Sequence, residues 1–225
     1  MGDLVDFPSN GGTAQGHLAG SGGPGVVLLQ EWWGLVPHIV DVAERLAAEG
    51  FVVLAPDLYH GESTTEPDEA AKRLMELDFD RAARDIRGAA QYLAGSDDVT
   101  GRGVGAVGFC MGGSLALWSG AIAPEVVATV PFYPAIPPEK LAADWSAYAG
   151  KSVLMHLAEG DGGSGSPGVQ AAAAAVRAAG GDVELHDYPG TEHAFFNDAR
   201  PEVHDAPAAA LAWTRTLDFL RERLG

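Results

Sequence analysis

The sequence predicts an α/β fold in which a mainly parallel sheet is flanked by helices on both faces. Continuous apolar runs of five to seven residues recur along the chain, as in strands buried on both faces. Helical segments separate these runs, which is the pattern of right-handed βαβ units. A length of 225 residues and a hydrophobic content of 47% suit one domain, residues 1–225, with a large core.

The N-terminal segment predicts a hairpin at the edge of the sheet. Polar and apolar residues alternate in Leu4–Phe7 and in Thr13–Ala19, on either side of the turn sequence Asn10-Gly11-Gly12. The glycine-rich stretch Gly20–Gly25 then predicts a flexible connector.

Buried strands and helices are expected to alternate from there to the end of the chain. The expected strands are Val26–Gln30, Phe51–Ala55, Val104–Phe109, Val126–Phe132, Ser152–Ala158 and Val183–Asp187. The expected helices are Val36–Glu49, Glu66–Ala94 in two pieces broken near Asp78, Met111–Ser119, Val169–Ala179 and Ala206–Leu224.

Charge and composition exclude several classes of partner. The formal net charge is −17, from 14 basic and 31 acidic residues, which argues against nucleic acid and anionic membranes. No apolar run approaches the roughly 20 residues of a membrane span. A single cysteine and no recognisable signal peptide in residues 1–10 predict a reducing, cytoplasmic compartment. No helix shows an exposed apolar stripe that another subunit would have to cover, so a monomer or weak homo-oligomer is expected.

The one cysteine lies in a distinctive setting. Gly108-Phe109-Cys110-Met111-Gly112 follows a predicted strand and precedes a predicted helix. It matches the nucleophile elbow G-x-S-x-G of α/β-hydrolases, with cysteine in place of serine. Glycines are expected there because larger side chains would collide with the neighbouring strand or helix. Without this setting, Cys110 would be interpreted as a small buried apolar residue.

An acid and a histidine follow Cys110 at the ends of later strands. The order Cys110, Asp161, His193 is the order of the triad members in α/β-hydrolases. Cys110 would attack, His193 would carry the proton, and Asp161 would orient the imidazole. The backbone N–H groups of Met111 and Trp32 are expected to form the oxyanion hole.

Other residues compete for these roles. His60 also follows a strand, and Glu159 lies close to Asp161. Position after the last core strand favours His193 over His60, and His156 and His186 fall within strands. His204 lies close to the last helix. Asp57 is interpreted as a structural turn residue.

Cofactor and metal motifs are weak. Gly103–Gly108 matches G-x-G-x-x-G, but it lies inside a strand and lacks the acidic residue about 20 positions later. The histidines lack metal-ligand spacing. No cofactor or metal is therefore expected.

Four stretches of the sequence together resemble the dienelactone hydrolase family. They are Gln30-Glu31-Trp32-Trp33-Gly34, Pro56-Asp57-Leu58-Tyr59, Gly108-Phe-Cys-Met-Gly-Gly113 and Gly190-Thr-Glu-His-Ala-Phe195. The resemblance implies an α/β-hydrolase fold without a large lid and a cofactor-free enzyme with a Cys110-His193-Asp161 triad. It also implies that Glu31 lies against the thiol, keeps it protonated at rest and takes part in activating it when substrate binds.

The expected activity is hydrolysis of a small ester or lactone, of the carboxymethylenebutenolidase type, through a thioacyl enzyme. The alternative is a non-catalytic small-molecule binding protein or thiol sensor on the same fold. Family members acting on dienelactone hold its carboxylate with arginines, and Arg200 could serve here, whereas Arg81 could not be aligned. The expected substrate-binding residues are Trp33, Tyr59, Tyr133, Phe195 and Arg200.

Overall fold

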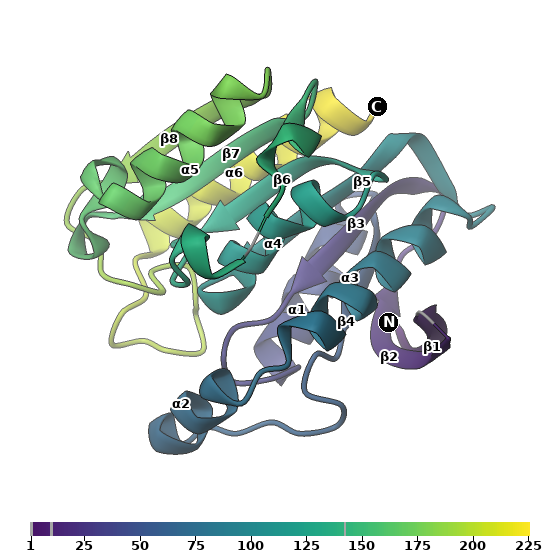
Figure 1. Cartoon of the computed structure of the whole chain (residues 1–225). Coiled ribbons are helices and arrows are strands. Elements are labelled where there is room, and N and C mark those ends of the chain that lie inside the picture. The colour runs from purple at the N-terminus through teal and green to yellow at the C-terminus, as the bar shows by residue number, and fades with distance from the viewer. Residues whose placement is uncertain (1, 10, 142) are drawn as a thin grey trace.

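The structure is a computed structural model of the chain and describes residues 2–9, 11–141 and 143–225. Within these residues, eight strands form one sheet in the order β1-β2-β4-β3-β5-β6-β7-β8 (Figure 1). Pairing is antiparallel between β1 and β2 and between β2 and β4, and parallel between all other neighbours. The strands are β1 (Asp3–Ser9), β2 (Gly12–Ala19), β3 (Gly23–Leu29), β4 (Val52–Pro56), β5 (Val99–Phe109), β6 (Val126–Phe132), β7 (Ser152–Ala158) and β8 (Asp182–Tyr188).

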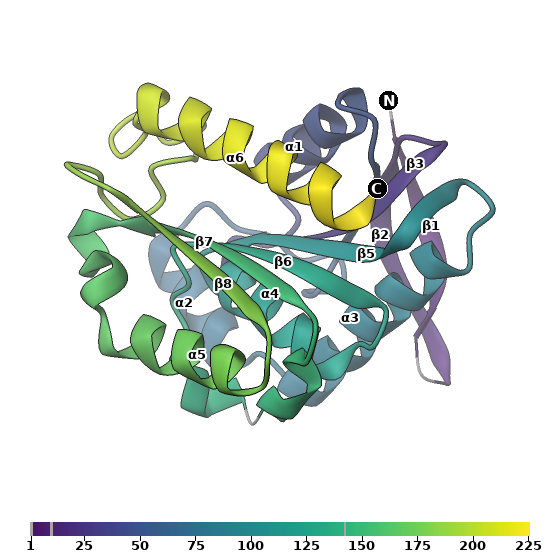
Figure 2. The same cartoon turned by 90° about the horizontal axis from the view of Figure 1, so that it is seen from above.

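Helices cover both faces of the sheet, which confirms the predicted fold class (Figure 2). On one face lie α1 (Pro37–Ala48) and α6 (Ala206–Leu224), and on the other lie α3 (Phe79–Ala94), α4 (Met111–Ile122) and α5 (Pro167–Ala178). Successive side chains of a strand point to opposite faces. Val26 and Leu28 of β3 therefore join the core under α1 and α6, whereas Val27 and Leu29 join the core under α3 and α4.

The long helical segment breaks where the sequence predicts. The short helix α2 (Pro67–Met75) ends before Asp78, and α3 begins directly after it. The side chain of Asp78 accepts a hydrogen bond from the backbone N–H of Arg81 at 3.0 Å, which caps α3. Pro67 occupies the first turn of α2, where its missing N–H costs nothing.

Two strands of the core begin three or more residues earlier than predicted, and most other strand ends differ by a single residue or not at all. Gly23–Gly25 was expected to be a flexible connector but forms the start of β3. The reason is close packing, because a Cβ on Gly23 would lie 1.8 Å from the carbonyl oxygen of Gly50. Strand β5 begins at Val99 and not at Val104, since its first residues are polar or exposed and give no buried pattern.

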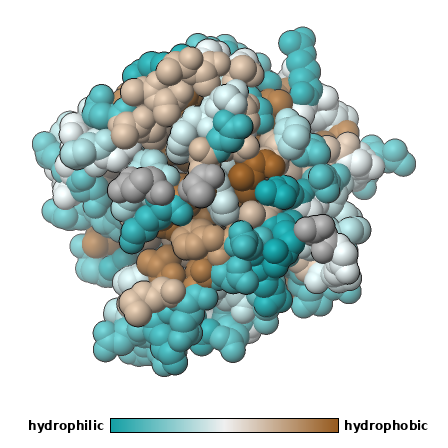
Figure 3. Space-filling model, viewed as in Figure 1, coloured by the Kyte–Doolittle hydropathy of each residue, from teal (hydrophilic) through white to brown (hydrophobic). Residues whose placement is uncertain are grey.

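The N-terminal hairpin is confirmed, and β1 lies at the edge of the sheet, although Asn10 of its turn is outside the described residues. The segment between β6 and β7 contains the short 3-10 turns η1 (Pro138–Leu141) and η2 (Trp145–Tyr148). Among the described residues, none of the helices combines the length and apolar character needed to cross a membrane. The face in Figure 3 is mostly hydrophilic, with apolar residues gathered near its centre.

Candidate active site

Cys110 stands on a sharp turn between β5 and α4. Its backbone has φ 56° and ψ −116°, a conformation that L-residues rarely adopt. A Cβ on Gly108 would lie 2.0 Å from the carbonyl oxygen of Gly112, and a Cβ on Gly112 would lie 2.3 Å from that of Leu29. Both distances are too short for any side chain, so the steric explanation of the glycines is confirmed.

The structure brings the predicted acid and histidine together beside this turn. His193 lies in the loop after β8, and Asp161 ends the 3-10 turn η3 (Glu159–Asp161) that follows β7. Their side chains are joined by a hydrogen bond of 2.7 Å between His193 Nδ1 and Asp161 Oδ2. The thiol of Cys110 lies close enough to His193 to raise the pKa of its imidazole. Three strand ends thus supply one chain of contacts from acid to imidazole to thiol.

The surroundings of His193 favour its charged form. Burial by itself lowers the pKa of the imidazole, but the hydrogen bond to Asp161 and the interactions with Cys110 outweigh it. Together they raise the pKa of His193 from 6.5 to about 10. The pair with Asp161 therefore holds His193 as an imidazolium at neutral pH.

This raised pKa predicts a pH-dependent contribution to stability. Because the folded pKa lies above the unfolded one, the contribution of His193 is complete below pH 6.5 and is lost as pH rises through about 10. Urea unfolding of the wild type and of His193→Gln across this range should show a stability difference that shrinks with increasing pH. In Asp161→Asn the pH dependence should weaken, because the main partner of the imidazolium is gone. A difference that is constant between pH 6 and 10 would contradict the assignment.

Glu31 lies in the same place, at the end of β3. Its side chain is 1% exposed, and Asn197 Nδ2 donates a hydrogen bond to its Oε2 at 2.7 Å. Burial raises the pKa of Glu31 above 4.5, against the lowering effects of Asn197, His193 and Arg200. The buried acid is thus electrostatically linked to His193.

The sequence did not single out Asn197 as a functional residue. It is buried, and its Oδ1 accepts a hydrogen bond from the N–H of Ala199 at 3.0 Å, which turns Nδ2 toward Glu31. The stretch Phe196-Asn197-Asp198, between His193 and Arg200, carries no motif that would mark Asn197.

The acidic residue next to Asn197 anchors this loop to α1. Asp198 lies 3.2 Å from both His38 Nδ1 and Arg45 NH1. The guanidinium of Arg45 also lies 5.2 Å from the ring centre of Phe196 and 4.9 Å from that of Trp213. These contacts fix the path of the loop, and therefore the position of Asn197 beside Glu31.

Tyr133 is packed into the centre of the site. It is 1% exposed, and its ring meets that of His193 edge-on at 5.0 Å. Burial, together with the charges of Glu31 and Cys110, raises the pKa of its phenol well above 10, so the hydroxyl stays protonated. Among the described residues this hydroxyl has no hydrogen-bond partner.

The other predicted substrate-binding residues are distributed unevenly. Trp33 and Arg200 line one cavity of about 490 Å³, which Asn197 also lines. Tyr59 lines a separate recess, and its hydroxyl contacts Met111 Sδ at 3.4 Å. Phe195 is fully buried against Tyr133 and Tyr188, so its placement supports a packing role, and its contact with substrate stays a prediction.

The predicted oxyanion-hole residues come from the elbow itself and from the loop after β3. Met111 is the first residue of α4, where backbone N–H groups have no partner within the helix. Trp32 follows Glu31 in the loop after β3, and the close approach of Gly112 to Leu29 brings that loop next to Cys110.

The competing residues have structural partners elsewhere. His60 Nε2 lies 3.3 Å from the buried carboxylate of Asp85. Glu159 accepts a hydrogen bond from the N–H of Gly190 at 2.8 Å, and Asp57 accepts one from Tyr59 at 3.0 Å within its own turn. His156 is fully buried between the hydroxyls of Tyr188 and Thr216.

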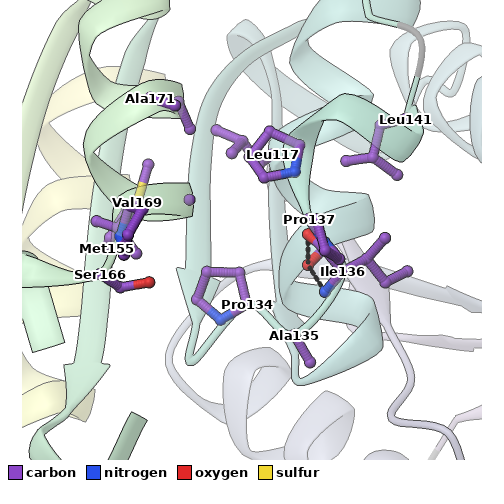
Figure 4. A pocket seen from close by; sticks show the side chains of 15 residues that line it. Leu117, Pro134, Ala135, Ile136, Pro137, Leu141, Met155, Ser166, Val169 and Ala171 are labelled. Carbon is purple, nitrogen blue, oxygen red and sulfur yellow. Dashed lines mark hydrogen bonds between the residues drawn. The ribbon is translucent and has the colours of Figure 1, made fainter. Parts of the chain in front are cut away.

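A second cavity lies between α4 and α5. Its volume is about 500 Å³. Figure 4 shows that its apolar walls face each other. Leu117, Ile136, Met155 and Val169 line it, and the hydroxyl of Ser114 accepts from the N–H of Ile136 at 2.8 Å. None of the predicted triad residues belongs to its lining.

The part of the chain that the structure describes contains no cluster of three or more potential metal ligands.

The parallel sheet, the elbow after β5 and the acid and histidine after β7 and β8 define the class of protein, an α/β-hydrolase. Within that class, the sequence profile of the dienelactone hydrolase family matches residues 15–224, and the chain belongs to this family.

Similar proteins extend over the full length of the chain. "Protein usf" of Aquifex pyrophilus is 34% identical, and the "Putative carboxymethylenebutenolidase" of Aquifex aeolicus is 33% identical, each covering 100% of both chains. A dienelactone hydrolase-like promiscuous phosphotriesterase from metagenomic libraries has a similar structure, with a TM-score of 0.80 and 26% identity. The match covers 100% of this chain and 99% of the other. The chain is thus a dienelactone hydrolase-like hydrolase.

Proposed function

We propose that this hydrolase cleaves a small ester or lactone through a thioester formed on Cys110. The observation that carries the proposal is the continuous contact from Asp161 through His193 to Cys110, at a strained turn whose glycines are sterically required. The carboxymethylenebutenolidase named among the relatives supports a lactone or ester as substrate.

The reaction takes place in two halves. With the thiol proton on the imidazolium of His193, the Cys110 sulfur attacks the carbonyl carbon, whose oxygen becomes an oxyanion held by the N–H groups of Met111 and Trp32. The carbon–oxygen bond to the leaving group breaks as His193 returns the proton to it. Water, deprotonated by His193, then attacks the thioester and releases the acid and the thiol. Asp161 stabilises the imidazolium in both halves.

The proposal is tested by following p-nitrophenyl acetate hydrolysis and trapping the intermediate. Rapid mixing should give a burst of about one p-nitrophenol per enzyme if deacylation is slow. Mass spectrometry of acid-quenched protein should find one acetyl group on the peptide that contains Cys110. An enzyme that hydrolyses the ester without acetylating Cys110 would contradict the thioester, and an enzyme without activity on esters or lactones would contradict the function.

Asn197 gives this mechanism a measurable pH dependence. We propose that Glu31 assists activation of the thiol in its ionised form, which the hydrogen bond from Asn197 favours. A hydrogen bond to a charged group contributes about 1.5–3 kcal/mol. Asn197→Ala should therefore move the acid limb of the kcat/KM profile upward by about one to two pH units.

The acid limb of the kcat/KM profile should disappear in Glu31→Gln. The double variant with Asn197→Ala and Glu31→Gln should behave as Glu31→Gln does, because both changes act on one carboxyl group. Gln91→Ala removes an exposed amide on α3 and serves as the control. An acid limb that stays in place in Asn197→Ala would show that Asn197 does not act through Glu31.

A further inference from the structure

The cavity beside Glu31 carries a pair of opposite charges. Its volume is about 490 Å³, and its lining includes Trp33, Thr64, Asn197, Arg200 and Glu202. It adjoins the catalytic centre, because Asn197 bonds to Glu31 and Arg200 influences the pKa of both Glu31 and Tyr133. A substrate attacked by Cys110 could therefore extend one of its ends into this cavity.

The positive charge in this cavity already has a partner. Arg200 Nε donates a hydrogen bond to Glu202 Oε1 at 2.9 Å. The guanidinium carbon of Arg200 lies 5.8 Å from the ring centre of Trp33, so the group is held between a carboxylate and an aromatic ring. The charge of Arg200 is thus matched by Glu202 before any substrate arrives.

The neighbouring groups supply no further positive charge to the cavity. His38 lines it, but burial lowers the pKa of this imidazole, which favours the neutral form at pH 7. Hydrogen bonds to its own backbone N–H and to Arg200 lower the pKa of Glu202, so its carboxylate is ionised. In the separate recess at Tyr59, Arg73 is paired with Glu62.

We propose that this cavity receives an uncharged part of the substrate and that Glu202 disfavours substrates bearing a carboxylate. The proposal rests on the proposed function and names its substrate class as neutral esters or lactones. A carboxylate entering the cavity must either displace Glu202 from Arg200 or lie beside a second negative charge. Because this ion pair is exposed to solvent, its discrimination amounts to roughly fivefold at most.

Two ester substrates of matched length distinguish the effect of charge on kcat/KM from the effect of size. Ethyl valerate ends in a methyl group, and monoethyl succinate ends in a carboxylate; both carry an alkoxide leaving group that the substrate carboxylate does not expel, and their hydrolysis is followed by titrating the acid released. The wild type should have the higher kcat/KM with the valerate. Glu202→Gln should raise kcat/KM for the succinate about fivefold and leave the valerate unchanged, because Arg200 is then free to pair with the substrate.

Two controls isolate the pair from the overall negative charge. Asp218→Asn removes one exposed carboxylate on α6 and should leave the ratio of the two kcat/KM values unchanged. Arg200→Gln combined with Glu202→Gln should lose the gain on the succinate, since no guanidinium remains to receive it.

The outcomes are distinct. Equal kcat/KM values for the two esters in the wild type, or an unchanged ratio in Glu202→Gln, would overturn this inference while leaving the proposed function intact. Absence of hydrolysis of the valerate, p-nitrophenyl acetate and lactones alike would overturn the proposed function and this inference with it.

Discussion

Replacement of Cys110 by alanine should lower kcat/KM for p-nitrophenyl acetate at least about a thousandfold, because it removes the atom that forms the intermediate. The residual rate would come from the remaining oxyanion hole and substrate binding. Cys110→Ser should fall between alanine and the wild type, since a hydroxyl fits the same turn but is much harder to deprotonate than a thiol. Initial rates at saturating and subsaturating ester provide the measurement.

The loss of activity in Cys110→Ala must be shown to come from the missing thiol and not from unfolding. The thermal midpoint of Cys110→Ala should stay close to that of the wild type, because only one small side-chain atom is removed. His60→Gln changes the other histidine at a strand end and should retain the wild-type rate, since His60 is paired with Asp85. Wild-type activity in Cys110→Ala would show that another residue is the nucleophile. A large fall in the thermal midpoint would show that the loss of activity results from unfolding.

Substitution of Gly112 by alanine should be among the most destabilising single changes in the chain. The new Cβ would lie 2.3 Å from the carbonyl oxygen of Leu29 and 2.4 Å from that of Gln30. Both are backbone atoms of the central sheet region, so relief requires α4 to move away from β3. Overpacking of this kind costs about 3 kcal/mol, which corresponds to a fall of roughly 10 °C in Tm for a domain of this size.

A matched control exists in the same chain. In Gly165→Ala the new Cβ would meet no described atom within 4 Å, and the backbone there is not left-handed. Its Tm should change by no more than a few degrees. Differential scanning calorimetry of both variants gives the comparison, and a Gly112→Ala midpoint equal to that of Gly165→Ala would show that the elbow is not tightly constrained.

Much of the fold could be predicted because the core strands are continuous apolar runs. The positions of Cys110, Asp161 and His193 also followed from sequence, since the carboxyl ends of parallel strands meet at one edge of the sheet. Gly23–Gly25 was misinterpreted because a glycine needed for close packing looks the same in a sequence as one that gives flexibility. The length of β5 could not be predicted either, because its first residues, from Val99, lie outside the core and form no apolar run.

The contacts of Asn197 and Glu202 could not be predicted. Both lie in the segment between His193 and α6, whose path depends on the anchoring of Asp198 by His38 and Arg45 from α1, a distant part of the chain. No local periodicity reports such a contact. Phe195, two residues after His193, was expected to contact substrate; the structure places it fully buried in the core, and its contact with substrate stays a prediction.

Strand β8 forms one edge of the sheet, and an open edge can pair with a strand of another molecule. Here the outer residues of β8 carry Asp182 and Glu184, with Arg223 of α6 at 3.8 and 3.9 Å from them. At the opposite edge, β1 carries Asp3 and Asp6. Two approaching edges of the same kind would place like charges together, so the charge pattern opposes sheet-to-sheet aggregation. This protection acts between exposed charges and should therefore weaken as the salt concentration rises.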